Sequence, residues 1–497
     1  MNAQPDPHYR ALVARDARFD GVFYVGVSTT GIYCRPICTA RTPRRERCSF
    51  FGSAAEAERA GFRACFRCRP ELAPGQGSVD AVPRLLARAA GHIEAGFLDS
   101  HSVAELAAQL GVSARHLRRA MEERLGVSPQ ALAQSRRLAM AKRLLHDTQL
   151  GLAHLALASG FGSVRRFNAA FVARFGRPPS AVRRKLTAGE RAASLALRLD
   201  ARPPLDWSAL LEFFAARAVP GLEECSAGEY RRVVTLGGAV GTVIVRADAR
   251  RPALWAEVSA GLVPVVAALV PALRRLFDLD ARPALIREAL AQDPDLAALL
   301  RVRPGLRVPG ALGAFELVCR AVLGQQVSVR GATTLAGRLV ARWGEPLPAR
   351  ELRELSARRP GCALTQQFPV AAQLARATTA ELREVGLPGQ RAQTLAHVAR
   401  AFSTGPLAAS EQLDDDAFAR ALAAIPGIGD WTVQYVLLRA RGAPDAFPAA
   451  DLGIRKALGG VSAKVAEARS ARWRPWRAYA VMQLWASLSG AAPRRST

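Results

Sequence analysis

The sequence predicts a multidomain protein that is mainly α-helical, with small α/β parts. Its 497 residues are too many for a single hydrophobic core, and half of them are apolar. Apolar residues recur with helical periodicity over most of the chain, and strand-like runs are short and few. We therefore expect four domains.

The charge balance points to an acidic partner. Lysine and arginine number 69 against 42 aspartate and glutamate residues, a formal net charge of +27, and arginine supplies most of the excess. Such an excess favours a polyanion such as double-stranded DNA. The longest apolar run, 262–273, is broken by two prolines, and no secretory signal is visible. We expect a cytoplasmic protein with no membrane partner.

Composition also sets the expected domain boundaries. A linker is expected at 73–78 and a second junction at 187–190. Two strands, 195–199 and 240–245, and two helices, 207–216 and 264–277, are expected in a small α/β segment. The four expected domains are 1–76, 79–187, 195–303 and 304–490.

The first domain carries four cysteines in two close pairs, Cys34-x3-Cys38 and Cys65-x2-Cys68. Two such pairs can hold one tetrahedral Zn2+. On spacing alone, an inert zinc knot that only stabilises the small domain is the simpler interpretation. Cys48 lies outside both pairs and is expected to be an ordinary buried thiol.

The residues around these cysteines, 21–25, 28–38 and 60–68, resemble the N-terminal domain of the adaptive-response (Ada) family over residues 8–71. The resemblance implies that the four cysteines bind one Zn2+ and that Cys34 also accepts a methyl group from a methylated DNA phosphotriester. A zinc-held thiolate stays ionised at neutral pH, and its methylation removes one negative charge, which should favour DNA binding. No organic cofactor is expected.

Two helix-turn-helix patterns follow in the second domain. Ser113 precedes an expected helix at 114–124, and Ser163 precedes another at 164–174, with a joining helix at 132–145. An arginine-rich helical bundle is the alternative. The pair resembles the AraC-type DNA-binding domain over residues 83–184, which implies a promoter site and RNA polymerase as partners. The expected DNA-binding residues are Arg115, Arg118, Arg165, Arg166 and Asn168.

The stretch 422–432 contains a Pro-Gly-Ile-Gly turn between two expected helices. Gly427 and Gly429 let the backbone approach a partner closely, and the N–H groups that follow suit a phosphate. A purely structural turn is the alternative. Trp431 and Tyr435 lie one helical turn apart, where they could stack on a flipped base or simply pack in the core.

This turn, together with residues 320–328, 447–455 and 472–480, resembles the HhH-GPD superfamily, and more closely the AlkA-type 3-methyladenine DNA glycosylase II, over residues 195–490. The resemblance implies that Asp451 is the catalytic carboxylate, which stabilises an oxocarbenium-like sugar or orients a water. Its other interpretation is a helix N-cap. The implied DNA-binding residues are Gln325, Gln326, Gly427, Gly429 and Thr432.

The sequence departs from these families in two places. Gln326 stands where the glycosylase family has an apolar leucine wedge, and the Pro-Cys-His-Arg methyltransferase tetrad of the Ada family is absent. We expect a monomer that combines an alkylation sensor and activator with an alkyl-base glycosylase. The alternatives are a transcriptional regulator whose glycosylase half only binds DNA, and a repair enzyme whose N-terminal half only adds DNA affinity.

Overall fold

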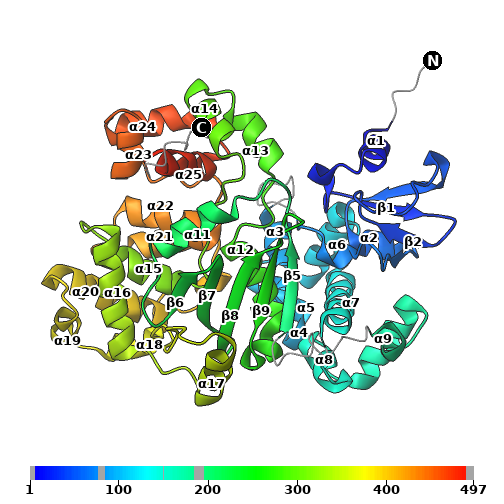
Figure 1. Ribbon diagram of the computed structural model, residues 1–497, viewed down its shortest axis with the longest axis horizontal. Helices are drawn as coiled ribbons and strands as arrows, with labels where there is room; N and C mark the ends of the chain where they lie inside the picture. The colour runs from blue at the N-terminus through cyan, green and yellow to red at the C-terminus, as the bar shows by residue number, and fades with distance from the viewer. Residues whose placement is uncertain (1–5, 76–83, 149, 184–194, 489–497) are drawn as a thin grey trace. The chain divides into compact units, whose positions relative to one another are not determined.

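A computed structural model describes residues 6–75, 84–148, 150–183 and 195–488. The chain forms two compact units (Figure 1). The first comprises 1–203, 236–239 and 248–272, and the second comprises 204–235, 240–247 and 273–497. The junction expected at 187–190 and part of the linker expected at 73–78 lie outside the described residues. Within those residues, no helix is long and apolar enough to cross a membrane.

The first unit begins with a four-stranded sheet of order β3-β1-β2-β4. Strand β1 pairs antiparallel with β2 and β3, whereas β4 pairs parallel with β2. The strands are β1 (Tyr24–Val27), β2 (Ile32–Cys34), β3 (Cys48–Phe51) and β4 (Arg63–Ala64), with helices α1 (Pro7–Val13) and α2 (Ala54–Arg59) and short 3-10 turns at Ala17–Phe19, Arg45–Arg47 and Pro70–Leu72. The core of this domain is small, with Phe23, Val25 and Cys48 among its buried residues.

The helical part of the first unit contains both expected helix-turn-helix patterns. Serine side chains accept backbone N–H groups at the starts of four helices, so the expected starts after Ser113 and Ser163 are confirmed. The helices are α3 (Arg84–Glu94), α4 (Phe97–Ser100), α5 (Val103–Gln109), α6 (Ala114–Leu125), α7 (Pro129–Asp147), α8 (Leu152–Ala158), α9 (Val164–Phe175) and α10 (Pro179–Val182).

Five strands form a second sheet of order β5-β9-β8-β7-β6, in which β5–β9 and β6–β7 pair antiparallel. The strands are β5 (Leu195–Asp200), β6 (Glu223–Ser226), β7 (Glu229–Leu236), β8 (Ala239–Ala247) and β9 (Ala253–Val258). Helix α11 (Trp207–Ala215) lies between β5 and β6 in the chain. A 3-10 turn (Ala260–Val265) and the helices α12 (Val266–Leu276), α13 (Pro283–Leu290) and α14 (Pro294–Val302) follow β9. The expected strands at 195–199 and 240–245 are confirmed. The helix expected from residue 264 begins at Val266, after the 3-10 turn.

Helices make up the rest of the described chain. They are α15 (Ala314–Leu323), α16 (Val329–Trp343), α17 (Ala349–Arg358), α18 (Ala371–Arg376), α19 (Thr379–Glu384), α20 (Gly389–Ser403), α21 (Asp415–Ala423), α22 (Asp430–Val436), α23 (Leu452–Ala457), α24 (Ala463–Ser470) and α25 (Arg477–Leu488), with 3-10 turns at Ser410–Gln412 and Ala471–Trp473 and a π-helical turn at Leu437–Arg441. One apolar core joins α15, α16, α20 and α22. It fixes the hairpin between α21 and α22 against the segment that follows α15.

Candidate functional site

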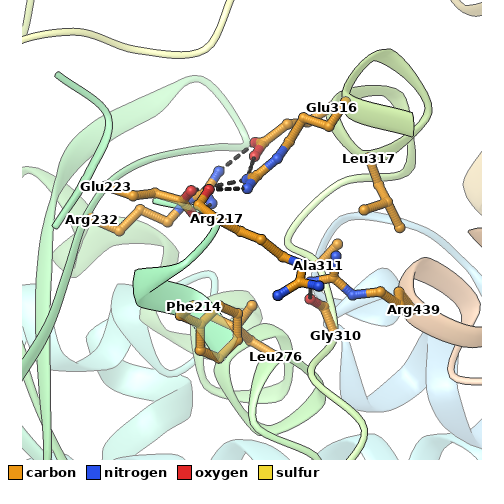
Figure 2. Close-up of a pocket in the computed structure, with 11 residues that line it drawn as sticks. Phe214, Arg217, Glu223, Arg232, Leu276, Gly310, Ala311, Glu316, Leu317 and Arg439 are labelled. Atoms are coloured by element: carbon orange, nitrogen blue, oxygen red, sulfur yellow. Dashed lines mark hydrogen bonds and ion pairs between the residues drawn. The ribbon is translucent and has the colours of Figure 1, made fainter. Parts of the chain in front are cut away.

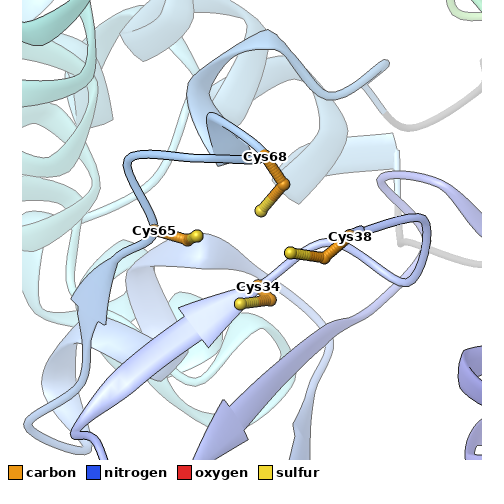
Figure 3. Close-up of side chains that lie close together, drawn as sticks. All are labelled: Cys34, Cys38, Cys65 and Cys68. Carbon is orange, nitrogen blue, oxygen red and sulfur yellow. The ribbon is translucent and has the colours of Figure 1, made fainter. Parts of the chain in front are cut away.

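The four paired cysteines of the first unit converge on one point (Figure 3). The parallel pairing of β2 with β4 places Cys34 beside Cys65, whose N–H donates to Tyr33 O at 3.0 Å. All four sulfur atoms lie within 4.8 Å of one another. A tetrahedral zinc with Zn–S bonds of about 2.3 Å separates its sulfurs by about 3.8 Å. The donor set and its spacing therefore fit one zinc ion.

The protonation of these sulfurs also fits a cation. Contact with Cys34 lowers the pKa of Cys65, whereas contact with Cys38 raises the pKa of Cys34. The four thiols thus compete for protons, and a divalent cation at their centre removes this competition because it favours four thiolates. Cys38 and Cys65 are buried, whereas Cys34 and Cys68 are half-buried. Cys48 is buried as expected, and its Sγ donates to Arg44 O at 3.3 Å.

The helix-turn-helix residues lie at the starts of α6 and α9. Arg115, Arg118, Arg165 and Arg166 are exposed. Asn168 differs, because it is half-buried and its Oδ1 is buried without a hydrogen-bond partner. Four of the five expected residues are therefore accessible from the solvent, and Asn168 is not fully so.

Asp451 forms the centre of the second site. It is the N-cap of α23, and its Oδ1 accepts the N–H of Ile454 at 2.9 Å. The same oxygen accepts Nε1–H of Trp485 at 3.0 Å, and Oδ2 accepts Nε1–H of Trp431 at 2.9 Å. Three N–H groups thus orient the carboxylate, and none of them belongs to a cation. The N-cap interpretation is confirmed, and it leaves the carboxylate available for chemistry.

Aromatic rings extend from this carboxylate. The rings of Trp431 and Tyr435 are nearly parallel, at 11°, with centroids 5.2 Å apart, and Trp485 is tilted by 53° at 6.3 Å from Tyr435. Stacking a base between two rings requires two gaps of about 3.5 Å, so Trp431 and Tyr435 cannot sandwich one. The two rings stack on each other, and both are half-buried; we call this pair the aromatic wall.

The hairpin between α21 and α22 has the expected form. Gly427 has a φ of +88°, and a Cβ there would lie 2.0 Å from Thr394 Oγ1, so only glycine fits. Gly427 and Gly429 are exposed, but the side chain of Thr432 is buried at 2 % exposure and does not face the surface. Its N–H donates to Gly429 O at 3.0 Å.

The segment after α15 is fastened to this hairpin. Gln325 Nε2 donates to Gly427 O at 3.1 Å, and Arg391 Nη1 donates to Gln325 O at 3.0 Å. Between these anchors Gln326 is exposed and has a φ of +56°, which is rare for a residue other than glycine. Such strain persists only where the surroundings impose it. The segment therefore presents Gln326 outward in a fixed conformation.

The sequence pattern did not reveal two parts of this site. Trp485, on α25, completes the carboxylate's hydrogen bonds. Arg439 lies on the π-helical turn, where its Nη1 donates to the Tyr435 hydroxyl at 2.7 Å. A tryptophan on an apolar helix and an arginine in an Arg-rich chain carry no local signal of such a role.

Family models match four stretches of the chain. They are the metal binding domain of Ada over residues 7–71, a helix-turn-helix domain over 106–185, the AlkA N-terminal domain over 196–313, and the HhH-GPD superfamily base excision DNA repair protein over 319–476. The resemblances stated from the motifs are confirmed, and so is DNA as a binding partner.

Two relatives and one solved structure are similar to this chain over long stretches. A protein of Mycobacterium tuberculosis, named as a probable bifunctional transcriptional activator/DNA repair enzyme AlkA, is 39% identical over 97% of this chain and 96% of its own. DNA-3-methyladenine glycosylase 2 of Escherichia coli is 36% identical over 58% of this chain and 95% of its own. The 3-methyladenine DNA glycosylase of Archaeoglobus fulgidus shares the fold over 58% of this chain and 97% of its own, with a TM-score of 0.50 at 22% identity.

Proposed function

We propose a function on one premise: the chain belongs to the family of bifunctional transcriptional activators and DNA repair enzymes of the AlkA type. Its C-terminal half is a helix-hairpin-helix DNA glycosylase that hydrolyses the N-glycosidic bond of alkylated bases of the 3-methyladenine type. Its N-terminal half binds DNA, senses methylphosphotriesters by methyl transfer to a zinc-bound cysteine, and activates transcription.

The geometry of Asp451 carries the repair reaction. An alkylated purine bears a positive charge and leaves readily, so the sugar becomes oxocarbenium-like as the bond breaks. A carboxylate beside that sugar stabilises its charge or orients the attacking water. The indole N–H groups of Trp431 and Trp485 hold the carboxylate in place and leave its charge uncompensated. The aromatic wall starts at the Trp431 indole, which supports the proposal that a flipped base would lie next to the carboxylate.

Cys34 is the proposed methyl acceptor among four zinc ligands, the others being Cys38, Cys65 and Cys68. The zinc, when bound, keeps the sulfurs ionised. Cys38 and Cys65 are buried, and Cys68 Sγ accepts the N–H of Arg35 at 3.4 Å. Cys34 is half-buried, and within the described residues a backbone N–H donates to Cys68 Sγ whereas none donates to Cys34 Sγ. Fewer hydrogen bonds leave a thiolate more nucleophilic.

The remaining assignments follow from the same premise. We propose the four domains 1–76, 79–187, 195–303 and 304–490, with the starts of α6 and α9 in DNA grooves and with Gln325, Gln326, Gly427 and Gly429 at the damaged site. The exposed arginines at the starts of α6 and α9 support the proposed groove contacts, and the exposed Gln326 supports the proposed contact at the damaged site. Damaged DNA and a promoter are the proposed double-stranded partners. RNA polymerase, a monomeric state and a cytoplasmic location stay predictions.

Asp451→Asn tests the repair assignment. Asparagine also caps helices, so the fold and DNA binding should persist, while release of 3-methyladenine from methylated DNA should fall by about a hundredfold or more. The matched control is Asp414→Asn, an exposed N-cap of α21 that should release base normally. Near-normal release by Asp451→Asn would refute the assignment and favour a regulator whose glycosylase half only binds DNA.

A further inference from the structure

A cavity in the second unit contains an imbalance of buried charge (Figure 2). Glu223 and Glu316 each pair with both Arg232 and Arg320. For Arg320 the distances from Nη1 are 2.9 Å to Glu223 and 3.0 Å to Glu316. These two arginines and two glutamates balance one another. Two more arginines line the cavity, Arg217 and Arg439.

Arg217 and Arg439 are held by neutral groups. Arg439 donates to Pro309 O at 2.8 Å and to Gly310 O at 3.0 Å, and it is 6% exposed. Both guanidinium groups lie over the ring of Phe213, at 3.8 Å for Arg217 and 4.8 Å for Arg439. Within the described residues, neither guanidinium group forms an ion pair with a carboxylate. Arg439 is buried and Arg217 is half-buried. Cations that are held only by dipoles in such surroundings are costly, and a nearby acidic group gains from ionising.

The nearest acidic group is the hydroxyl of Tyr435, which accepts Arg439 Nη1–H at 2.7 Å. Burial alone raises the pKa of this phenol, but the charges of Arg439, Arg217 and Arg320 outweigh burial and leave the pKa below its usual value. Burial in turn lowers the pKa of Arg217, while Tyr435 raises it. The geometry and the charge balance agree that this phenol ionises more readily than an ordinary tyrosine.

The backbone explains how Arg439 comes to face inward. Helix α22 passes directly into the π-helical turn Leu437–Arg441, which shifts the register of the side chains. Figure 2 shows Arg439 and Arg217 directed to the same side of the cavity, beside Gly310 and Ala311 and away from the two glutamates. Turns of this kind are rare and concentrate at functional sites.

We propose that Arg217 and Arg439 turn Tyr435 into an anionic member of the aromatic wall, and that its electron-rich ring selects positively charged bases over neutral ones. This inference rests on the proposed glycosylase function. A cationic alkylated purine on the wall adds positive charge beside the ring and favours the phenolate, and the phenolic proton passes to the solvent. A neutral purine gains no such attraction. The wall thus joins Asp451, through Trp431, to a group that recognises the charge of the base.

The test compares a cationic and a neutral base in the full-length protein. Duplexes carry either 3-methyladenine, which is cationic in DNA, or hypoxanthine, which is neutral. In wild type, kcat/KM for 3-methyladenine should rise with pH through the pKa of Tyr435, because the phenolate is the form above that pKa. The ratio of the two kcat/KM values should fall about tenfold in Tyr435→Phe and lose this pH dependence.

Arg439→Gln should move the inflection of the pH profile upward, towards the pKa of an ordinary tyrosine of about 10. The ultraviolet difference absorbance of tyrosinate, titrated in the free protein, should show a phenol that ionises below that value and is missing in Tyr435→Phe. Equal losses on both substrates, or an Arg439→Gln inflection unchanged from wild type, would overturn the proposal. If wild type releases neither base, the glycosylase assignment fails, and the spectroscopic titration still decides whether Tyr435 is anionic.

Discussion

At Asp451 one carboxylate serves both the fold and the proposed chemistry. Its Oδ1 caps α23, and the two indoles of Trp431 and Trp485 fix its orientation. The space around it depends on Gly453, where a Cβ would lie 3.0 Å from Asp451 Oδ1 and 3.2 Å from Trp485 Cδ1. A single methyl group at position 453 therefore presses on the carboxylate and on one of its hydrogen-bond donors.

Gly453→Ala separates activity from stability. Alanine favours a helix over glycine by about 1 kcal/mol, so the thermal midpoint should stay the same or rise slightly. Base release should fall at least tenfold, because displacing a positioned catalytic group costs rate steeply. The measurement is single-turnover release of 3-methyladenine alongside thermal unfolding.

Gly389→Ala is the matched control, since this helical glycine has no atom within 4 Å of an added Cβ. It should leave the release rate unchanged. Full activity in Gly453→Ala would show that Asp451 tolerates displacement and is not the positioned group.

Helix starts were predictable from single residues, whereas contacts between distant elements were not. Serine and aspartate residues predicted the starts of α6, α9 and α23, because an N-cap side chain accepts an N–H group only three residues further along the chain. Strands β6 and β7 were not predicted from the sequence. Their charged residues, among them Glu223 and Arg232, are buried as ion pairs, so the strands lack the alternation of apolar and polar residues that usually indicates a strand. No residue pattern predicted the π-helical turn Leu437–Arg441, and the inward direction of Arg439 depends on this turn.

The zinc domain shows how much an element can depend on a ligand. Its apolar core is small and includes Phe23 and Val25, and sheet strands as short as β4 have two residues. A domain with so little buried surface needs a further source of stability, which four thiolates around a metal provide.

Removing zinc should unfold this domain and leave the glycosylase intact. Chelation should abolish an early thermal transition and expose the four ligand cysteines to a thiol reagent, while release of 3-methyladenine persists. Metal analysis should find one zinc per chain, and Cys48→Ala should retain it because Cys48 lies outside the cluster. Protein purified without chelator that contains no zinc would contradict the metal assignment.

The two proposed chemistries lie in different compact units, Cys34 in the first and Asp451 in the second. Within the first unit, the zinc site and the helix-turn-helix part are in contact. Lys142 of α7, which is 1% exposed, donates to Cys65 O and to Glu71 Oε2, each at 2.9 Å. The sensor is thus tied to the helices that would read a promoter, and the repair site has its own core.

Methylation of Cys34 should therefore change promoter binding and leave base release unchanged. The S–CH3 bond forms as the O–CH3 bond of the phosphotriester breaks, the phosphodiester anion leaves, and the sulfur loses its negative charge. Repulsion towards DNA phosphate falls, so promoter affinity should rise by about the value of one or two phosphate contacts, and the gain should shrink with added salt. Peptide mass mapping after exposure to methylated DNA should place the methyl on Cys34 alone, with Cys34→Ala unreactive and Cys48→Ala reactive. A methyl on Cys68, the other half-buried ligand, or unchanged promoter binding with Cys34 methylated would show that the sensor works differently.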